Sequence, residues 1–150
     1  MAIKVIIPEE IKHNITQKQI DLVAEQCEKF IDVSPTWNGG ATYRGLAVTD
    51  SLIEQWKGIV GKETTIDMRG TSSWSTDVNI GTQYASKWVS KENPRKALFI
   101  CEGEQYGTSI QHIAKYPQEK EVLCSNKSKW IISSYEEING FVIFTVRLAI

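Results

Sequence analysis

The sequence lacks a charge excess of either sign and any long hydrophobic run. Its 150 residues include 17 lysines and arginines against 18 aspartates and glutamates, so the formal net charge is −1 at pH 7. A general binder of nucleic acid or of anionic membrane surfaces needs a basic excess. A membrane span needs roughly 18 consecutive apolar residues, and no run in this chain approaches that length. We therefore expect neither nucleic acid nor membrane among its partners.

Cysteine is also sparse. Cys27, Cys101 and Cys124 form no Cys-x-x-Cys pair, which excludes a disulfide framework and a zinc site of the usual spacing. The N-terminal segment lacks the apolar core and the small-residue cleavage site of a signal peptide. These absences predict that the protein acts in the cytoplasm of a cell, either a bacterial host or the target of a toxin.

The length of the chain is sufficient for one folded domain. A chain of this length buries about 68–70% of the surface of its unfolded state, which allows a core without metal or disulfide support. The four prolines are scattered, and no repeat or low-complexity linker divides the chain. We predict a single domain over residues 1–150.

Apolar periodicity predicts helices early in the chain and strands later. Helical spacing occurs over residues 16–32, 52–60 and 78–89, and Asp77 is the expected N-cap of the last helix. Strands are expected at 41–47, 64–68, 71–76, 96–101, 121–125, 129–134 and 140–150, with residues 103–117 irregular. Because the order does not alternate as in βαβ units, it predicts an α+β fold with a largely antiparallel sheet.

Tyr43-Arg44-Gly45 is the first of three segments whose side chains suit a ligand. An arginine inside a strand is costly to bury unless its charge is matched. Its forked guanidinium suits a phosphate or a carboxylate. An arginine at the sheet edge that points to water is the alternative interpretation.

The second segment, residues 72–77, reads Ser-Ser-Trp-Ser-Thr-Asp and places four hydroxyl groups within five residues. Such a row of short donors can orient a carboxylate or a sugar hydroxyl. A strand end rich in serine, followed by a helix cap at Asp77, explains the same residues without a ligand.

The third segment, residues 116–123, reads Tyr-Pro-Gln-Glu-Lys-Glu-Val-Leu. Glu119 and Glu121 are two positions apart, so in a strand both carboxylates lie on one face. Two carboxylates facing a cleft can divide the work of stabilising a cationic anomeric carbon and handling the nucleophile. An acidic, solvated strand end is again the alternative.

An arginine on an early strand, Ser-Thr on a middle strand and Glu-x-Glu late in the chain together resemble the arginine–serine–glutamate class of mono-ADP-ribosyltransferases. That superfamily includes binary clostridial toxins, cholera-type toxins and phage-encoded transferases. Tyr43-Arg44-Gly45 matches its arginine motif, and Trp74-Ser75-Thr76 matches its aromatic-Ser-Thr-Ser motif except that Asp77 replaces the final serine. The similarity spans residues 41–148 and leaves the N-terminal segment as a helical lead-in.

The resemblance implies both a fold and a reaction. The family core consists of two packed, mostly antiparallel β-sheets with flanking helices, and NAD lies in the cleft between the sheets. The family transfers ADP-ribose from NAD to an acceptor and releases nicotinamide, and no metal is expected here. Because glutamate at the position of Glu119 goes with arginine acceptors in this family, the expected partner is a protein that is modified at an arginine side chain.

The resemblance also assigns the catalytic roles. Glu121 is expected to stabilise the oxocarbenium-like ribose and to contact its 2′-hydroxyl, and Ser75 to hold the Glu121 carboxylate in place. Glu119 is expected to contact the acceptor and to help remove its proton. The loop before Glu119 is expected to meet the acceptor protein through Tyr116, although Tyr116 packed in the core under the loop is an equal alternative.

The cofactor-binding residues implied by the resemblance come from the first two segments. Arg44 is expected to clamp the NAD phosphates, with Tyr43 and Gly45 beside it. Ser75 and Thr76 are expected to complete the site, with Thr76 supporting the turn of its strand.

Two other functions stay open at this point. In an NAD glycohydrolase, water would replace the acceptor. A non-enzymatic phage-structural or partner-binding module would keep the fold without the chemistry. The presence of Arg44, Ser75, Glu119 and Glu121 together argues against such a module, because loss of function would be expected to erase at least one of them.

Overall fold

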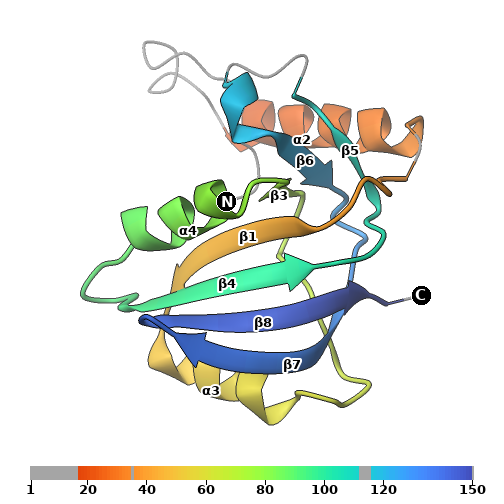
Figure 1. Ribbon diagram of the computed structural model, residues 1–150. Coiled ribbons are helices and arrows are strands. Elements are labelled where there is room, and N and C mark those ends of the chain that lie inside the picture. Colours follow the sequence, from red (N-terminus) through yellow and green to blue (C-terminus); the bar gives the residue numbers. More distant parts are fainter. Residues whose placement is uncertain (1–16, 35, 112–115, 150) are drawn as a thin grey trace.

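The computed structural model describes residues 17–34, 36–111 and 116–149 (Figure 1). Its helices are α2 (Gln17–Asp32), α3 (Asp50–Gly58) and α4 (Val78–Lys87), with a 3₁₀ turn η1 (Pro117–Glu119). Its strands are β1 (Thr42–Val48), β2 (Thr65–Ile66), β3 (Ser72–Ser75), β4 (Arg95–Cys101), β5 (Gly107–Ser109), β6 (Glu121–Cys124), β7 (Trp130–Ile138) and β8 (Phe141–Leu148). The predicted α+β class is confirmed.

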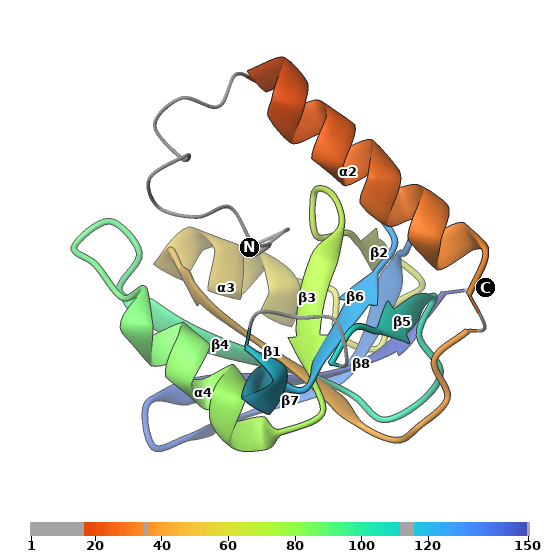
Figure 2. The same ribbon diagram turned by 90° about the horizontal axis from the view of Figure 1, so that it is seen from above.

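The strands form one sheet in the order β2-β7-β8-β4-β1-β3-β6-β5. Within the described ranges every neighbouring pair is antiparallel except β4 and β8. β1 and β3 share a single residue pair, Tyr43 with Ser75, so the sheet divides there into two halves. Figure 2 shows β3 and β6 running across the direction of β1 and β4. The two sheets that the family resemblance implied are therefore two halves of one mostly antiparallel sheet, joined at this pair.

Both halves contribute to one hydrophobic core. Trp74 on β3 and Val122 on β6 share it with Phe99 on β4 and Trp130 on β7. The ring centroids of Trp74 and Trp130 lie 5.4 Å apart, which places the two halves in direct contact. Burial of these large side chains stabilises the arrangement of the two halves, and Trp74 also lines the cleft described below.

The helices begin where the sequence predicts. Thr49 caps α3, because its Oγ1 accepts a hydrogen bond from the Leu52 amide at 3.1 Å. Asp77 caps α4 in the same way, with Oδ1 accepting from the Asn79 amide at 2.9 Å. No helix in the described part of the chain is long and apolar enough to cross a membrane.

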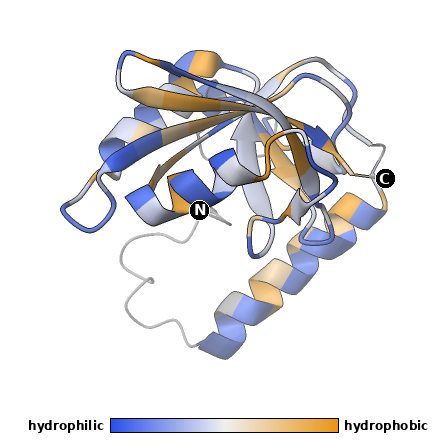
Figure 3. Cartoon of the chain, turned by 90° about the horizontal axis from the view of Figure 1, so that it is seen from below, coloured by the Kyte–Doolittle hydropathy of each residue, from blue (hydrophilic) through white to orange (hydrophobic). Residues whose placement is uncertain are grey.

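The helical lead-in is confirmed for α2, which lies along β6 and β5 (Figure 1). Hydrophobic bands recur along this otherwise hydrophilic helix (Figure 3). Glu28 attaches α2 to the core, because its carboxylate accepts from Thr71 Oγ1 at 2.6 Å, Ser125 Oγ at 2.7 Å and the Asn126 amide at 2.8 Å.

Some predicted boundaries differ from the structure. β5 forms inside the segment expected to be irregular, and β7 extends four residues past its predicted end, to Ile138. The predicted turn at Asn139-Gly140 is confirmed, with φ of 51° and 84°. Residues 16, 112–115 and 150, which belong to predicted segments, lie outside the described ranges.

Helix α4 crosses β1 at unusually close range. A Cβ on Gly45 would lie 1.8 Å from the carbonyl oxygen of Gly81 and 2.7 Å from the amide nitrogen of Ala85, both of them backbone atoms. Only a residue without a side chain allows this contact. The glycine that follows Arg44 therefore sets the position of α4 over the cleft.

We expect Gly45→Ala to destabilise the protein by about 2–3 kcal/mol or more, because α4 must move away from β1. Thermal denaturation followed by circular dichroism measures the change. Gly58→Ala is the matched control: it lies on α3, and an added Cβ has no atom within 4 Å. Equal stability of the two variants would contradict the close-packing role of Gly45.

Candidate active site

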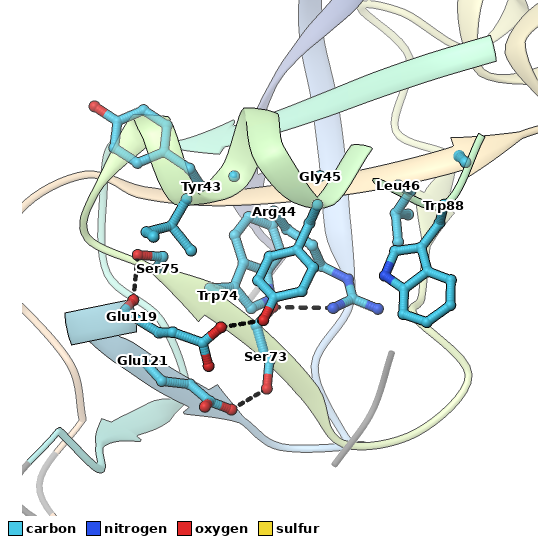
Figure 4. Close-up of a pocket in the computed structure, with 14 residues that line it drawn as sticks. Tyr43, Arg44, Gly45, Leu46, Ser73, Trp74, Ser75, Trp88, Glu119 and Glu121 are labelled. Carbon is cyan, nitrogen blue, oxygen red and sulfur yellow. Dashed lines mark hydrogen bonds between the residues drawn. The ribbon is translucent and has the colours of Figure 1, made fainter. Parts of the chain in front are cut away.

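A cleft opens where β1 and β3 part, with α4 on one side and the segment from η1 to β6 on the other. Its lining consists of Tyr43, Arg44, Gly45, Leu46, Ala47, Ser73, Trp74, Ser75, Ile80, Gly81, Tyr84, Trp88, Glu119 and Glu121 (Figure 4). Three segments far apart in the sequence therefore meet at one pocket. Thr76, which was also expected in the site, is not part of the lining.

Arg44 fills the gap between the diverging strands. If the β1–β3 ladder continued beyond Tyr43 and Ser75, Gly45 would pair with Ser73. Instead, the Ser73 carbonyl accepts a hydrogen bond from Arg44 Nη1 at 2.9 Å. The alternative of an arginine that points to water is wrong, because the residue is only 7% exposed.

Arg44 keeps its positive charge in this buried position. Burial lowers the pKa of Arg44 to about 10, while the negative charge of Glu121 acts in the opposite direction. A guanidinium with this pKa is still almost fully protonated at neutral pH. The cleft therefore contains a fixed cation suited to an anionic ligand group.

Glu121 is the first residue of β6 and pairs directly with Ser75 of β3. Its carboxylate, nearly buried at 7% exposure, accepts a hydrogen bond from the Ser73 hydroxyl (Figure 4). Ser73 and Ser75 are two positions apart on one strand, so both lie on the face that Glu121 occupies. The hydroxyl that bonds the Glu121 carboxylate is that of Ser73, where the resemblance implied Ser75.

Ser75 instead holds the backbone that carries Glu119. Its hydroxyl donates to the Glu119 carbonyl at 2.6 Å and accepts from the Asp77 amide at 3.0 Å. The Thr76 amide adjoins this link and donates to the Lys120 carbonyl at 3.1 Å. The Ser-Thr pair thus joins the end of β3 to the turn between η1 and β6.

Glu119 lies at the end of η1 and not in a strand, so the same-face argument from strand geometry is wrong for this residue. Lys120 follows it in the left-handed conformation, with φ of 48°, and this turn separates the two glutamates. The Glu119 carboxylate nevertheless points into the cleft beside Glu121 (Figure 4). Its Oε2 accepts a hydrogen bond from the Tyr84 hydroxyl.

Helix α4 supplies a wall of the cleft whose residues were not predicted from the sequence to belong to the site. Ile80 and Tyr84 of α4 and Trp88 at its C-cap are spaced by four, so they lie in one stripe, and all three line the cleft. Trp88 remains 52% exposed although it is a large aromatic residue. The spacing by four is visible in the sequence, but the direction in which these side chains face depends on how α4 crosses β1.

The segment before Glu119 presents an aromatic side chain at the surface. Tyr116 is 49% exposed, so of the two alternatives for this residue, core packing under the loop is wrong. Among the residues that the structure describes, no group of His, Cys, Asp and Glu side chains has an arrangement that could hold a metal ion.

No protein-family model and no curated protein sequence matches the chain. Solved structures match it closely in fold. The Vis toxin of Vibrio splendidus, in complex with agmatine, has a TM-score of 0.74 at 16% identity, over 96% of this chain and 64% of its own. The C3 exoenzyme of Clostridium limosum has a TM-score of 0.62 at 18% identity, over 91% of this chain and 72% of its own. The chain has the ADP-ribosyltransferase fold.

A third match is exoenzyme S of Pseudomonas aeruginosa, solved in complex with human 14-3-3 protein beta and bound to carba-NAD. Its TM-score is 0.66 at 13% identity, over 92% of this chain and 62% of its own. The chain thus spans less than two thirds of the length of Vis and of exoenzyme S. Within this ADP-ribosyltransferase fold, Ser73 joins Arg44 to Glu121, while Ser75 joins β3 to the Glu119 turn.

The two serines are therefore expected to act on different glutamates. Ser73→Ala removes a donor to a carboxylate, a bond worth about 1.5–3 kcal/mol, and under the function proposed below it should slow NAD cleavage by roughly 10- to 100-fold. Ser75→Ala leaves that bond in place and loosens the Glu119 turn, so under the same proposal it should slow transfer to an acceptor more than NAD cleavage. Nicotinamide release and acceptor labelling, measured in parallel, compare them. A larger loss of NAD cleavage in Ser75→Ala would contradict this division.

Proposed function

We propose that this chain transfers ADP-ribose from NAD to an arginine side chain of a protein and releases nicotinamide. The observation that carries the proposal is the meeting of two carboxylates and a buried guanidinium in one cleft. Each carboxylate has its own hydroxyl donor, Ser73 for Glu121 and Tyr84 for Glu119. Two carboxylates held separately can serve two different steps.

Cleavage of NAD is the first step. Arg44 binds the NAD pyrophosphate, which places the nicotinamide ribose beside Glu121. The bond between C1′ and the nicotinamide nitrogen breaks, and its electron pair leaves with neutral nicotinamide. The remaining ribosyl group becomes an oxocarbenium-like cation. The buried Glu121 carboxylate stabilises that charge in a site from which water is largely excluded.

Transfer to the acceptor is the second step. A guanidinium nitrogen of the acceptor forms the new bond to C1′ and gives up one proton. The Glu119 carboxylate binds the guanidinium cation and accepts that proton. An arginine is protonated at neutral pH, so it needs a neighbouring base to become a nucleophile. Tyr116, three residues before Glu119, contacts the acceptor protein in this proposal, and its side chain is exposed.

The solved structures support this assignment. Exoenzyme S was solved with carba-NAD, and Vis was solved with agmatine, a small molecule that carries a guanidinium group. Both matches have a fold like that of this chain.

The test is a reaction of the purified chain with NAD and an excess of agmatine, analysed by mass spectrometry. We expect an adduct of ADP-ribose with agmatine. Cadaverine, which carries an amine in place of the guanidinium, should give no adduct. Free ADP-ribose and nicotinamide without an adduct would favour an NAD glycohydrolase. Unchanged NAD in every reaction would favour a non-enzymatic module.

A further inference from the structure

Tyr84 is the residue of α4 that reaches the glutamate assigned to the acceptor. Its hydroxyl donates to Oε2 of Glu119, across 35 positions of sequence. The backbone of Glu119 is held as well, because its carbonyl oxygen accepts a hydrogen bond from Ser75 Oγ at 2.6 Å. A backbone anchor and a side-chain anchor together restrict where the Glu119 carboxylate can lie.

The donor itself has a fixed position. α4 is pressed onto β1 at Gly45 and Gly81, and the Ala85 side chain beside Tyr84 is fully buried. The N-cap at Asp77 holds the start of the helix, and the Asp77 amide donates to the same Ser75 hydroxyl that holds Glu119. The Tyr84 ring is therefore carried by a helix that cannot shift without disturbing its packing.

We propose that Tyr84 is a positioning residue that directs the Glu119 carboxylate toward the acceptor and so favours transfer over hydrolysis. This inference rests on the proposed function. The phenol keeps its proton and takes no part in making or breaking bonds. A carboxylate has about four lone-pair sites, so a bond from Tyr84 is compatible with simultaneous binding of a guanidinium. The bond holds the carboxylate in place in the cleft when the acceptor arrives.

Tyr84→Phe tests the proposal, because it removes the hydroxyl and keeps the ring that walls the cleft. We expect kcat/KM for agmatine to fall by roughly 10- to 100-fold, the effect of losing one hydrogen bond to a charged group. The KM for NAD and the rate of nicotinamide release without agmatine should change far less. Tyr135→Phe is the matched control, since Tyr135 lies on β7 in the other half of the sheet and is 44% exposed.

Glu119→Asp provides a second, independent variant. It keeps the carboxylate but withdraws it by one methylene from Tyr84, so it should lower the ratio of transfer to hydrolysis in the same way. Adding Tyr84→Phe to Glu119→Asp should then cause little further loss, because the bond is already broken. A role of Tyr84 in packing alone predicts that the two losses multiply.

The outcomes separate this inference from the proposed function. If the wild-type chain gives no adduct with agmatine, the proposed function fails. If the wild type gives the adduct and Tyr84→Phe has the wild-type ratio of transfer to hydrolysis, the positioning role fails. Equal losses of transfer and hydrolysis in Tyr84→Phe would also overturn it, because they would indicate a general effect on the cleft.

Discussion

Replacing Glu121 by glutamine is expected to slow both nicotinamide release and transfer to agmatine by about 10²–10³-fold. The substitution keeps the size of the side chain and removes its negative charge. Glu121 faces the cleft at 7% exposure, so water cannot replace the lost charge as the ribosyl cation develops. Because cleavage of NAD precedes attack by either water or arginine, both activities should fall together.

Glu136→Gln is the matched control for this variant, since Glu136 is an exposed glutamate of β7. Its activity should equal that of the wild type, and circular dichroism should show the same fold for both variants. If the Glu121→Gln protein folds and its rate of nicotinamide release falls by less than about tenfold, Glu121 does not take part in the reaction.

Replacing Glu119 by glutamine should have a different pattern. We expect transfer to agmatine to fall by at least about 10²-fold, because both the binding of the guanidinium and the removal of its proton lose the carboxylate. Nicotinamide release should persist, since water can still capture the ribosyl cation stabilised by Glu121. The measurement is the ratio of agmatine adduct to nicotinamide, taken from the same reaction.

The double variant should resemble Glu121→Gln, because without NAD cleavage the second step has no substrate. Loss of both activities in Glu119→Gln, with hydrolysis retained in Glu121→Gln, would mean that the two roles are exchanged. Full activity in both single variants would favour the alternative interpretation, in which Glu119 and Glu121 belong to an acidic, solvated chain segment without a catalytic role.

Local sequence signals predicted the elements well where the structure depends on near neighbours. Local contacts determine the helix caps and the last turn, at Thr49, Asp77 and Asn139-Gly140. Each of them depends on residues no more than three positions apart, so the local sequence is enough to predict it. The mostly antiparallel arrangement also followed from the order of helices and strands. The meeting of Arg44 with the Ser-Thr and Glu-x-Glu segments was expected only through the family resemblance.

The site residues that were missed or misassigned depend on distant contacts. Ser73 meets Glu121 across 48 positions, and Tyr84 meets Glu119 across 35. Nothing near Ser73 in the sequence distinguishes it from Ser75. Lys120 adopts a left-handed conformation without glycine or asparagine to indicate it, so the turn that separates the two glutamates appeared to be strand.

The most direct measurement is the stoichiometry of the wild-type reaction with NAD and saturating agmatine. Nicotinamide is quantified by chromatography, and the agmatine adduct by mass spectrometry, over one time course. We expect nicotinamide release well above the buffer blank and close to one adduct for each nicotinamide. Release of nicotinamide with no adduct would contradict arginine transfer, and no release above the blank would contradict NAD chemistry in this cleft altogether.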